Sequence, residues 1–300
     1  MEITSAERVM FPEVGVTKGE MVAYYQTVED QIFPFIEQRP LTLERYPRGI
    51  THKGFMQKNA AAHFPESIDR YTVPKSDGGV TTYPVITRAA DVPYLANQGT
   101  VSFHVWTSRV ERVDHPDFLV MDLDPEEGDV DGARTVTAAI GRLLESFGVA
   151  SQPVATGSKG FHVWAPLIPD AHWDRVALAG RALAGLVAQE LAKVATTEFL
   201  KKNRKGRVFV DSLRNHPGAS VVAPFSLRPR PTASLSMPVT WDELSQVEPA
   251  QWTIRNVENR LGSLPTWPRP SALPDEEIES AAREAGVDLE TEFDRFGRER

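Results

Sequence analysis

The sequence contains no cysteine and no long apolar run, and these two absences exclude several classes of protein. Without cysteine there is no disulfide, no thiolate nucleophile and no Cys-ligated zinc, which suits a reducing cytoplasm. No apolar run approaches the roughly 18–20 residues needed to cross a bilayer. The N-terminus lacks a basic segment followed by an apolar one, so we expect no signal peptide. These absences predict a cytoplasmic protein that has no membrane partner.

What is present is enough to build a large folded core. The chain has 300 residues, of which 41% are hydrophobic and 25% charged. Its net charge of −8 is unevenly distributed, because residues 271–300 hold ten acidic and four basic side chains. Residues 193–214 show the opposite bias, with seven basic and two acidic side chains. Such a segment can bind a phosphate backbone or can be a solvated loop, so charge alone does not show whether the protein binds nucleic acid.

Periodicity predicts a mixed α/β order of elements. A T-x-x-E capping box at residues 17–20 predicts the start of the first helix, and Pro34 is expected to close it. Residues 51–79 are polar and interrupted by prolines, which predicts an irregular loop. The other expected strands cover residues 41–46, 83–86, 101–106, 117–124, 151–156, 161–166 and 207–211, and the other expected helices cover 88–97, 131–147, 174–194, 245–261 and the acidic tail.

Asp122 and Asp124 form a D-x-D pattern in the strand expected at 117–124. Alternation along a strand places both carboxylates on one face, with Leu119, Met121 and Leu123 on the other. Two close carboxylates repel unless a divalent cation lies between them, and Mg²⁺ or Mn²⁺ prefers oxygen ligands. The pattern alone is weak, because carboxylates at a strand end more often cap a turn or bind water.

Asp211 is the candidate for a third carboxylate. It ends the strand expected at 207–211, where a lone aspartate is more often a strand-end cap. Here it is surrounded in sequence by Arg204, Arg207 and Arg214. A metal-binding carboxylate beside arginines that contact phosphate is what phosphoryl transfer requires.

The turn T-G-S-K-G at residues 156–160 is a candidate phosphate site. Its glycines allow a ligand to approach the backbone, successive N–H groups can bind phosphate oxygens, and Lys159 adds a positive charge. The turn lacks the G-x-x-x-x-G-K-[ST] pattern of a P-loop, and an ordinary hairpin turn is the commoner role for such a segment. Arg228 is either a further phosphate contact or a surface arginine between prolines, and His104 is either a nucleotide contact or a packed core histidine.

Together these motifs resemble the polymerase domain of bacterial ligase D and its stand-alone relatives, members of the archaeo-eukaryotic primase superfamily. The similarity covers about residues 8–262 and rests on nine segments in the same order: FPEVGVTKGEMVAYY, RPLTLERYPRGI, FMQKN, TYPVI, ANQGTVSFHVW, FLVMDLDP, TGSKGFHVWAPL, VFVDSLRN and VAPFSLRPR. The resemblance implies a primase-polymerase fold, with two packed β-sheet lobes and flanking helices around one cleft. It implies a catalytic domain over residues 1–264, followed by a linker and acidic helix over 265–300.

The resemblance also implies an activity. Such domains are metal-dependent polymerases that use two Mn²⁺ or Mg²⁺ ions and NTP or dNTP substrates, usually preferring ribonucleotides. They fill gaps and extend primers at broken DNA ends that carry a 5′-phosphate. Many act in non-homologous end joining with Ku and an ATP-dependent DNA ligase, at the nucleoid of the bacterial cytoplasm.

The match assigns roles residue by residue. It implies that Asp122, Asp124 and Asp211 are the catalytic, metal-binding residues. The implied nucleotide contacts are His104, Thr156, Ser158, Lys159 and Arg228, and the implied DNA contacts are Lys53, Phe55, Lys58 and Arg204. This chain departs from its relatives at Met56, where they commonly have a second aromatic residue, at Ser158, where they often have glycine, and at Arg214, where they often have glutamine or a similar residue.

Two other functions share some of these features. One is a D-x-D nucleotide-sugar glycosyltransferase, which uses the aspartates and a nucleotide but needs no template. The other is a non-catalytic module that binds DNA ends through the 5′-phosphate. Primer extension distinguishes both from a polymerase.

Overall fold

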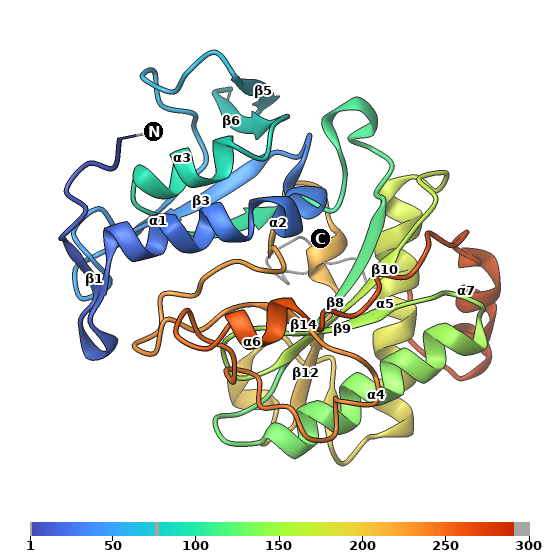
Figure 1. Ribbon diagram of the computed structural model, residues 1–300. Helices are drawn as coiled ribbons and strands as arrows, with labels where there is room; N and C mark the ends of the chain where they lie inside the picture. Colours follow the sequence, from blue (N-terminus) through green and yellow to red (C-terminus); the bar gives the residue numbers. More distant parts are fainter. Residues whose placement is uncertain (1, 76–77, 291–300) are drawn as a thin grey trace. The chain divides into compact units, whose positions relative to one another are not determined.

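The computed structural model describes residues 2–75 and 78–290, and the chain forms two compact units (Figure 1). Unit 1 comprises Met1–Glu111, Ser220–Met237 and Ala250–Gly262. Unit 2 comprises Arg112–Ala219, Pro238–Pro249 and Ser263–Arg300. The chain therefore passes between the units several times, and each unit contains segments that are distant in the sequence. The expected mixed α/β class is confirmed.

Unit 1 is built on an antiparallel sheet with the strand order β13-β7-β3-β4. These strands are β3 (Leu41–Arg45), β4 (Phe55–Gln57), β7 (Thr100–Val105) and β13 (Val221–Val222). The other elements of unit 1 are β1 (Val9–Phe11), β2 (Val16–Thr17), α1 (Lys18–Thr27), α2 (Glu29–Ile36), β5 (Ile68–Pro74), β6 (Val80–Ile86), α3 (Asp91–Asn97) and α6 (Glu258–Leu261).

The start of α1 follows from the capping box. The Thr17 hydroxyl accepts a hydrogen bond from the Glu20 backbone N–H at 3.2 Å, and the Glu20 carboxylate accepts one from the Thr17 N–H at 2.8 Å. The expectation that Pro34 closes this helix is wrong. The helix breaks at Val28, and Pro34 lies inside α2. A proline near the end of so short a helix removes little of its hydrogen bonding, so it is tolerated there.

Two further expectations are wrong, because pairing between distant backbone segments overrides the secondary structure that the local sequence favours. The segment 51–79 contains β4 and β5 rather than only a loop, because β3 and β6 supply their pairing partners. The helix expected over 245–261 is reduced to α6. Around Trp252 the backbone instead pairs with the segment that carries Ser234 and Leu235. This pairing occupies backbone N–H and C=O groups that a helix would need for its own hydrogen bonds.

Unit 2 is built on a sheet with the strand order β11-β12-β8-β10-β9-β14. The strands are β8 (Phe118–Asp124), β9 (Gln152–Ala155), β10 (Phe161–Pro166), β11 (Ala195–Thr196), β12 (Val208–Asp211) and β14 (Met237–Pro238). The helices are α4 (Val130–Ser146), α5 (Trp173–Glu190) and α7 (Asp275–Glu284). The central strand β8 pairs antiparallel with β10 on one side and with β12 on the other.

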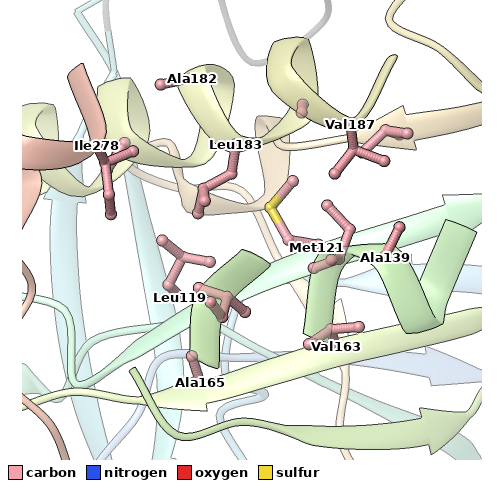
Figure 2. Close-up of a cluster of buried hydrophobic side chains, with 14 of the residues drawn as sticks. Leu119, Met121, Ala139, Val163, Ala165, Ala182, Leu183, Val187 and Ile278 are labelled. Atoms are coloured by element: carbon pink, nitrogen blue, oxygen red, sulfur yellow. The ribbon is translucent and has the colours of Figure 1, made fainter. Parts of the chain in front are cut away.

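The core of unit 2 lies between one face of this sheet and its helices. Leu119, Met121 and Leu123 of β8 are at most 1% exposed and belong to this core. Figure 2 shows Leu119 and Met121 with side chains of α4, α5 and α7, including Ala139, Leu183, Val187 and Ile278. Because residues alternate along β8, the aspartates between these apolar residues lie on the opposite face.

The helix α7 is an integral part of this core. Ile278 and Ala282 are fully buried, and Arg175 of α5 forms ion pairs with Asp275 at 2.6 Å and with Glu279 at 2.9 Å. The acidic helix expected in the tail is present as α7, and it contacts α5 (Figure 1). In the described part of the chain, no helix is both long and apolar enough to cross a membrane.

We predict that Ile278→Ala destabilises unit 2 by about 2–5 kcal/mol, because it leaves a cavity in the core. The matched control is Ile168→Ala, since the Ile168 side chain is exposed and its loss should cost less than about 0.5 kcal/mol. Urea unfolding followed by circular dichroism measures both. Equal midpoints for the two variants would show that α7 contributes nothing to the core.

Candidate active site

The three candidate carboxylates lie on one face of the unit 2 sheet, opposite its helices. Asp122 and Asp124 are two residues apart on β8, and Asp211 of β12 is the direct register partner of Asp122. Their side chains are only partly exposed, at 20% for Asp122, 34% for Asp124 and 8% for Asp211. Sheet pairing therefore unites residues that are almost ninety positions apart in the sequence.

Each of these carboxylates is paired with a cationic or potentially cationic side chain of unit 2. The Asp122 oxygens lie 3.3 Å from His162 Nε2 and 3.1 Å from Arg214 Nε. Asp124 lies 2.6 Å from Lys159 Nζ and 2.8 Å from Arg204 Nη1, and Asp211 lies 3.0 Å from Arg214 Nη2. The mutual repulsion of the carboxylates is thus offset by the protein's own side chains.

The two partly buried aspartates Asp122 and Asp211 respond differently to this environment. Burial alone would raise the pKa of Asp122, but the charges of His162 and Arg214 outweigh it and lower that pKa. Burial also dominates at Asp211, where repulsion from Asp122 adds to it, and the pKa is raised despite Arg214. Additional positive charge near Asp211 would therefore favour its ionised form.

The donor chemistry fits a divalent cation. Three carboxylates on one sheet face supply the oxygen ligands that Mg²⁺ and Mn²⁺ prefer. Within residues 2–75 and 78–290, however, no group of three Asp, Glu or His side chains is arranged around a common point. The carboxylates of Asp122, Asp124 and Asp211 contact arginine and lysine groups instead.

The turn after β9 is tightly organised next to Asp124. The Thr156 hydroxyl donates a hydrogen bond to the Gly160 carbonyl at 2.8 Å and accepts one from the Ser158 N–H at 3.2 Å. A Cβ atom at Gly160 would collide with the Leu123 carbonyl, so only glycine fits there. Lys159 donates to the Pro125 carbonyl at 2.9 Å in addition to its ion pair with Asp124. The turn thus directs a lysine toward the carboxylates.

His104 and Arg228 lie in unit 1, near a carboxylate that the sequence did not single out. His104 Nε2 lies 3.3 Å from a Glu44 oxygen, and Tyr46 donates a hydrogen bond to Glu44 at 3.1 Å. Burial opposes ionisation of Glu44, but His104 and the Arg228 charge lower its pKa. Burial, followed by Glu44, raises the pKa of Tyr46 to about 12. Two of the predicted nucleotide contacts therefore surround one carboxylate of the unit 1 sheet.

The predicted DNA contacts are divided between the two units. Lys53, Phe55 and Lys58 belong to unit 1, in or beside β4 at the edge of its sheet. Phe55 and the neighbouring Met56 are each 48% exposed, and the Arg45 guanidinium lies 5.5 Å from the centre of the Phe55 ring. Arg204 belongs to unit 2, where it is held by Asp124 and stacks 4.1 Å from the Phe209 ring. Their contact with DNA stays a prediction.

The sequence alone does not predict the roles of three residues of the unit 2 site. From the sequence, His162 is either a packed core histidine or a nucleotide contact, Arg214 is a basic neighbour of Asp211 that departs from the relatives, and Asn215 is a neighbour with no assigned role. Asn215 is buried and its side chain bonds both the N–H and the carbonyl of Val120, each at 2.8 Å. The contact of His162 follows from strand register, because His162 of β10 pairs directly with Asp122 of β8.

One weak sequence match concerns a different chemistry. Lys75, Ser76, Asp77 and Gly78 spell the K-x-D-G pattern of nucleotidyl-lysine ligases. The pattern lies between β5 and β6, and Ser76 and Asp77 lie outside the described residues. A match of four residues by itself carries no ligase assignment.

Residues 17–267 match the family model described as LigD, primase-polymerase domain. The chain is 30% identical over 264 residues to the multifunctional non-homologous end joining protein LigD of Mycolicibacterium smegmatis, covering 87% of this chain and 34% of that protein. It is 30% identical over 265 residues to the bifunctional LigD of Bacillus subtilis, covering 87% of this chain and 42% of that protein. The chain thus spans well under half the length of these two relatives.

A solved structure gives a similar result. The polymerase domain from Mycobacterium tuberculosis ligase D, in complex with DNA, is 30% identical and superposes with a TM-score of 0.80. The match covers 87% of this chain and 94% of the other. The fold of that domain is therefore reproduced over most of its length.

The opposite pKa shifts predict opposite mutational effects on metal-free stability. The folded pKa of Asp211 is raised, so its contribution to stability is full below about pH 3.9 and is lost as the pH rises through the folded pKa. Asp211→Asn should therefore raise the melting temperature at pH 7. The folded pKa of Asp122 is lowered, so its contribution is present at pH 7, and Asp122→Asn should lower the melting temperature.

Differential scanning fluorimetry in EDTA between pH 3.5 and pH 7 measures both effects. Both differences from the unmodified protein should shrink toward the acidic end of the range. Shifts of the same sign for the two variants at pH 7 would contradict the electrostatic description.

Proposed function

This chain belongs to the family of LigD primase-polymerase domains, and we propose that it is a template-directed nucleotidyltransferase that extends primers and fills gaps at DNA ends. The observation that carries the proposal is the pairing of Asp211 with Asp122 across two strands, on the sheet face that also bears Asp124. A lysine from the adjacent turn contacts the same group of carboxylates. Family membership removes the glycosyltransferase alternative.

In this proposal Asp122, Asp124 and Asp211 hold two divalent ions, Mn²⁺ or Mg²⁺. When bound, such ions lower the pKa of a primer 3′-hydroxyl and neutralise charge on the triphosphate. Other residues of unit 2 contact the nucleotide in this proposal. Lys159 exchanges its ion pair with Asp124 for the triphosphate, and the Thr156–Gly160 hydrogen bond fixes the turn that carries it. Thr156 and Ser158 contribute to nucleotide binding through the same turn.

The other proposed nucleotide contacts are His104 and Arg228, both in unit 1. Glu44 orients His104 by accepting a hydrogen bond at its Nε2, and its carboxylate attracts the Arg228 charge. Groups that can bear positive charge beside a partly buried carboxylate are preorganised for a phosphate, because little reorganisation is needed when the ligand arrives. We propose that ribonucleotides are preferred over deoxyribonucleotides as substrates.

DNA is the proposed partner, through Lys53, Phe55, Lys58 and Arg204. Support comes from the solved relative, which is a polymerase domain in complex with DNA, and from the end-joining role in the names of the curated relatives. We propose the same repair process for this chain, together with Ku and an ATP-dependent ligase, at the nucleoid of a bacterial cytoplasm. The substrate is a gapped or broken duplex that carries a 5′-phosphate.

We predict that the protein extends a labelled primer across a short gap and that Asp122→Ala reduces incorporation to the background without enzyme. The reason is that Asp122 is central to the carboxylate group. The matched control is Asp131→Ala, because Asp131 is also acidic, lies on α4 and is 93% exposed. Denaturing gels with NTP or dNTP, each with Mn²⁺ or Mg²⁺, measure extension, and fluorescence anisotropy measures DNA binding.

The outcome separates the proposals. Extension that survives Asp122→Ala would reject the assignment of the carboxylates. Binding of DNA ends without extension under any metal and nucleotide would favour the non-catalytic module instead.

We predict that Lys159→Ala raises the apparent KM for nucleotide about tenfold or more. A hydrogen bond to a charged group contributes roughly 1.5–3 kcal/mol, and 1.4 kcal/mol corresponds to a factor of ten. Asp124 keeps Arg204 as a partner in this variant, so the site should stay folded. Lys193→Ala removes an exposed lysine of the same unit and serves as the control. An unchanged KM would show that Lys159 pairs with Asp124 but does not contact the nucleotide.

A further inference from the structure

Arg214 stands out among the cations of the site because it contacts two of the three carboxylates. Its Nε lies 3.1 Å from Asp122 Oδ2, and its Nη2 lies 3.0 Å from Asp211 Oδ2. Lys159 and Arg204, by contrast, pair with Asp124. A planar guanidinium is suited to this bridging, since its N–H groups form a rigid fork that can engage two carboxylates at once.

The backbone around Arg214 holds it in this place. Arg214 lies in the turn Leu213–Asn215, directly after β12, and the Leu213 N–H donates to the Asp211 carboxylate at 2.8 Å. The buried Asn215 side chain ties the turn to the backbone of Val120 and also donates to the Ser212 carbonyl at 2.8 Å. The turn is therefore anchored to β8 and β12, the two strands that carry the aspartates.

We propose that Arg214 is a built-in counter-ion, which occupies the space between Asp122 and Asp211 and must be displaced when a divalent ion binds both carboxylates. The inference rests on the proposed function, because it concerns one of the two ions assigned to that site. An ion that coordinates both aspartates and an arginine that bridges them compete for the same oxygens. Metal binding at this position therefore includes the cost of breaking two ion pairs.

This competition depends on the charge at position 214. A neutral side chain there would have no charge to compete with the metal, whereas Arg214 carries a permanent one. The unmodified chain should thus tolerate metal-free conditions better than a variant with a neutral residue at position 214, and it should require a higher divalent ion concentration to load its site. Arg214 acts here as a positioning residue that controls access of the ion to Asp122 and Asp211.

The test is direct metal binding by the full chain. Free Mn²⁺ is measured by electron paramagnetic resonance during titration of the unmodified protein, Arg214→Gln and Arg214→Lys. Arg214→Gln should bind Mn²⁺ more tightly, on the order of tenfold, which is the low end of what residues adjoining metal ligands control. Arg214→Lys should fall between, because an ammonium keeps the charge without the fork. Arg142→Gln, an exposed arginine of α4, makes the same charge change away from the site and should leave Mn²⁺ affinity unchanged.

Thermal melting supplies an independent readout. In EDTA, Arg214→Gln should melt below the unmodified protein, because Asp122 and Asp211 lose their shared partner. Added Mn²⁺ should then raise its melting temperature more than it raises that of the unmodified protein. If Arg214→Gln is poorly folded, the Mn²⁺ affinity of Arg214→Lys, compared with that of the unmodified protein, tests the counter-ion role instead.

The outcomes separate this inference from the proposed function. Equal or weaker Mn²⁺ binding by Arg214→Gln and Arg214→Lys would overturn the counter-ion role while leaving the metal site intact. Absence of Mn²⁺ binding by every variant and by the unmodified protein would reject the metal site itself, and with it the inference.

Discussion

The structure of unit 2 depends on one electrostatic constraint: three carboxylates share one face of a sheet and need positive charge nearby. Direct pairing of Asp211 with Asp122 brings two of them together, and Asp124 lies two residues further along β8, on the same face. Burial makes their repulsion more costly, because the surroundings screen charge less than water does. The chain's own arginine, lysine and histidine side chains lie beside the carboxylates and supply this positive charge.

The same strand that presents the carboxylates also anchors the core. On β8, Leu119, Met121 and Leu123 pack against the helices, and the alternate positions Asp122 and Asp124 point to the other face. The site is therefore placed on a rigid central strand with a neighbour on each side, rather than on a mobile loop. The chain beyond the family match strengthens this support, since α7 packs its buried Ile278 into the same core.

Sequence patterns predicted the elements whose formation depends on local signals. The helices α4 and α5 and the strands β8, β10 and β12 lie within a few residues of where periodicity placed them. The failures share a cause. The strands β4 and β5 depend on partners elsewhere in the chain, and the segment around Trp252 pairs with Ser234 and Leu235 instead of continuing as a helix. Long-range pairing overrides local preference when it satisfies the backbone better.

By itself, the sequence determined the D-x-D strand, the glycine-lysine turn, the third aspartate and the family to which these belong. Each is a local pattern, so its residues are readable in one segment. Only the tertiary structure decided which cation serves which carboxylate: that Arg214 bridges Asp122 and Asp211, that Lys159 and Arg204 share Asp124, and that Glu44 gathers His104. Such pairs depend on strand register and on the direction of side chains from separate elements, and neither is encoded by the spacing of residues along the chain.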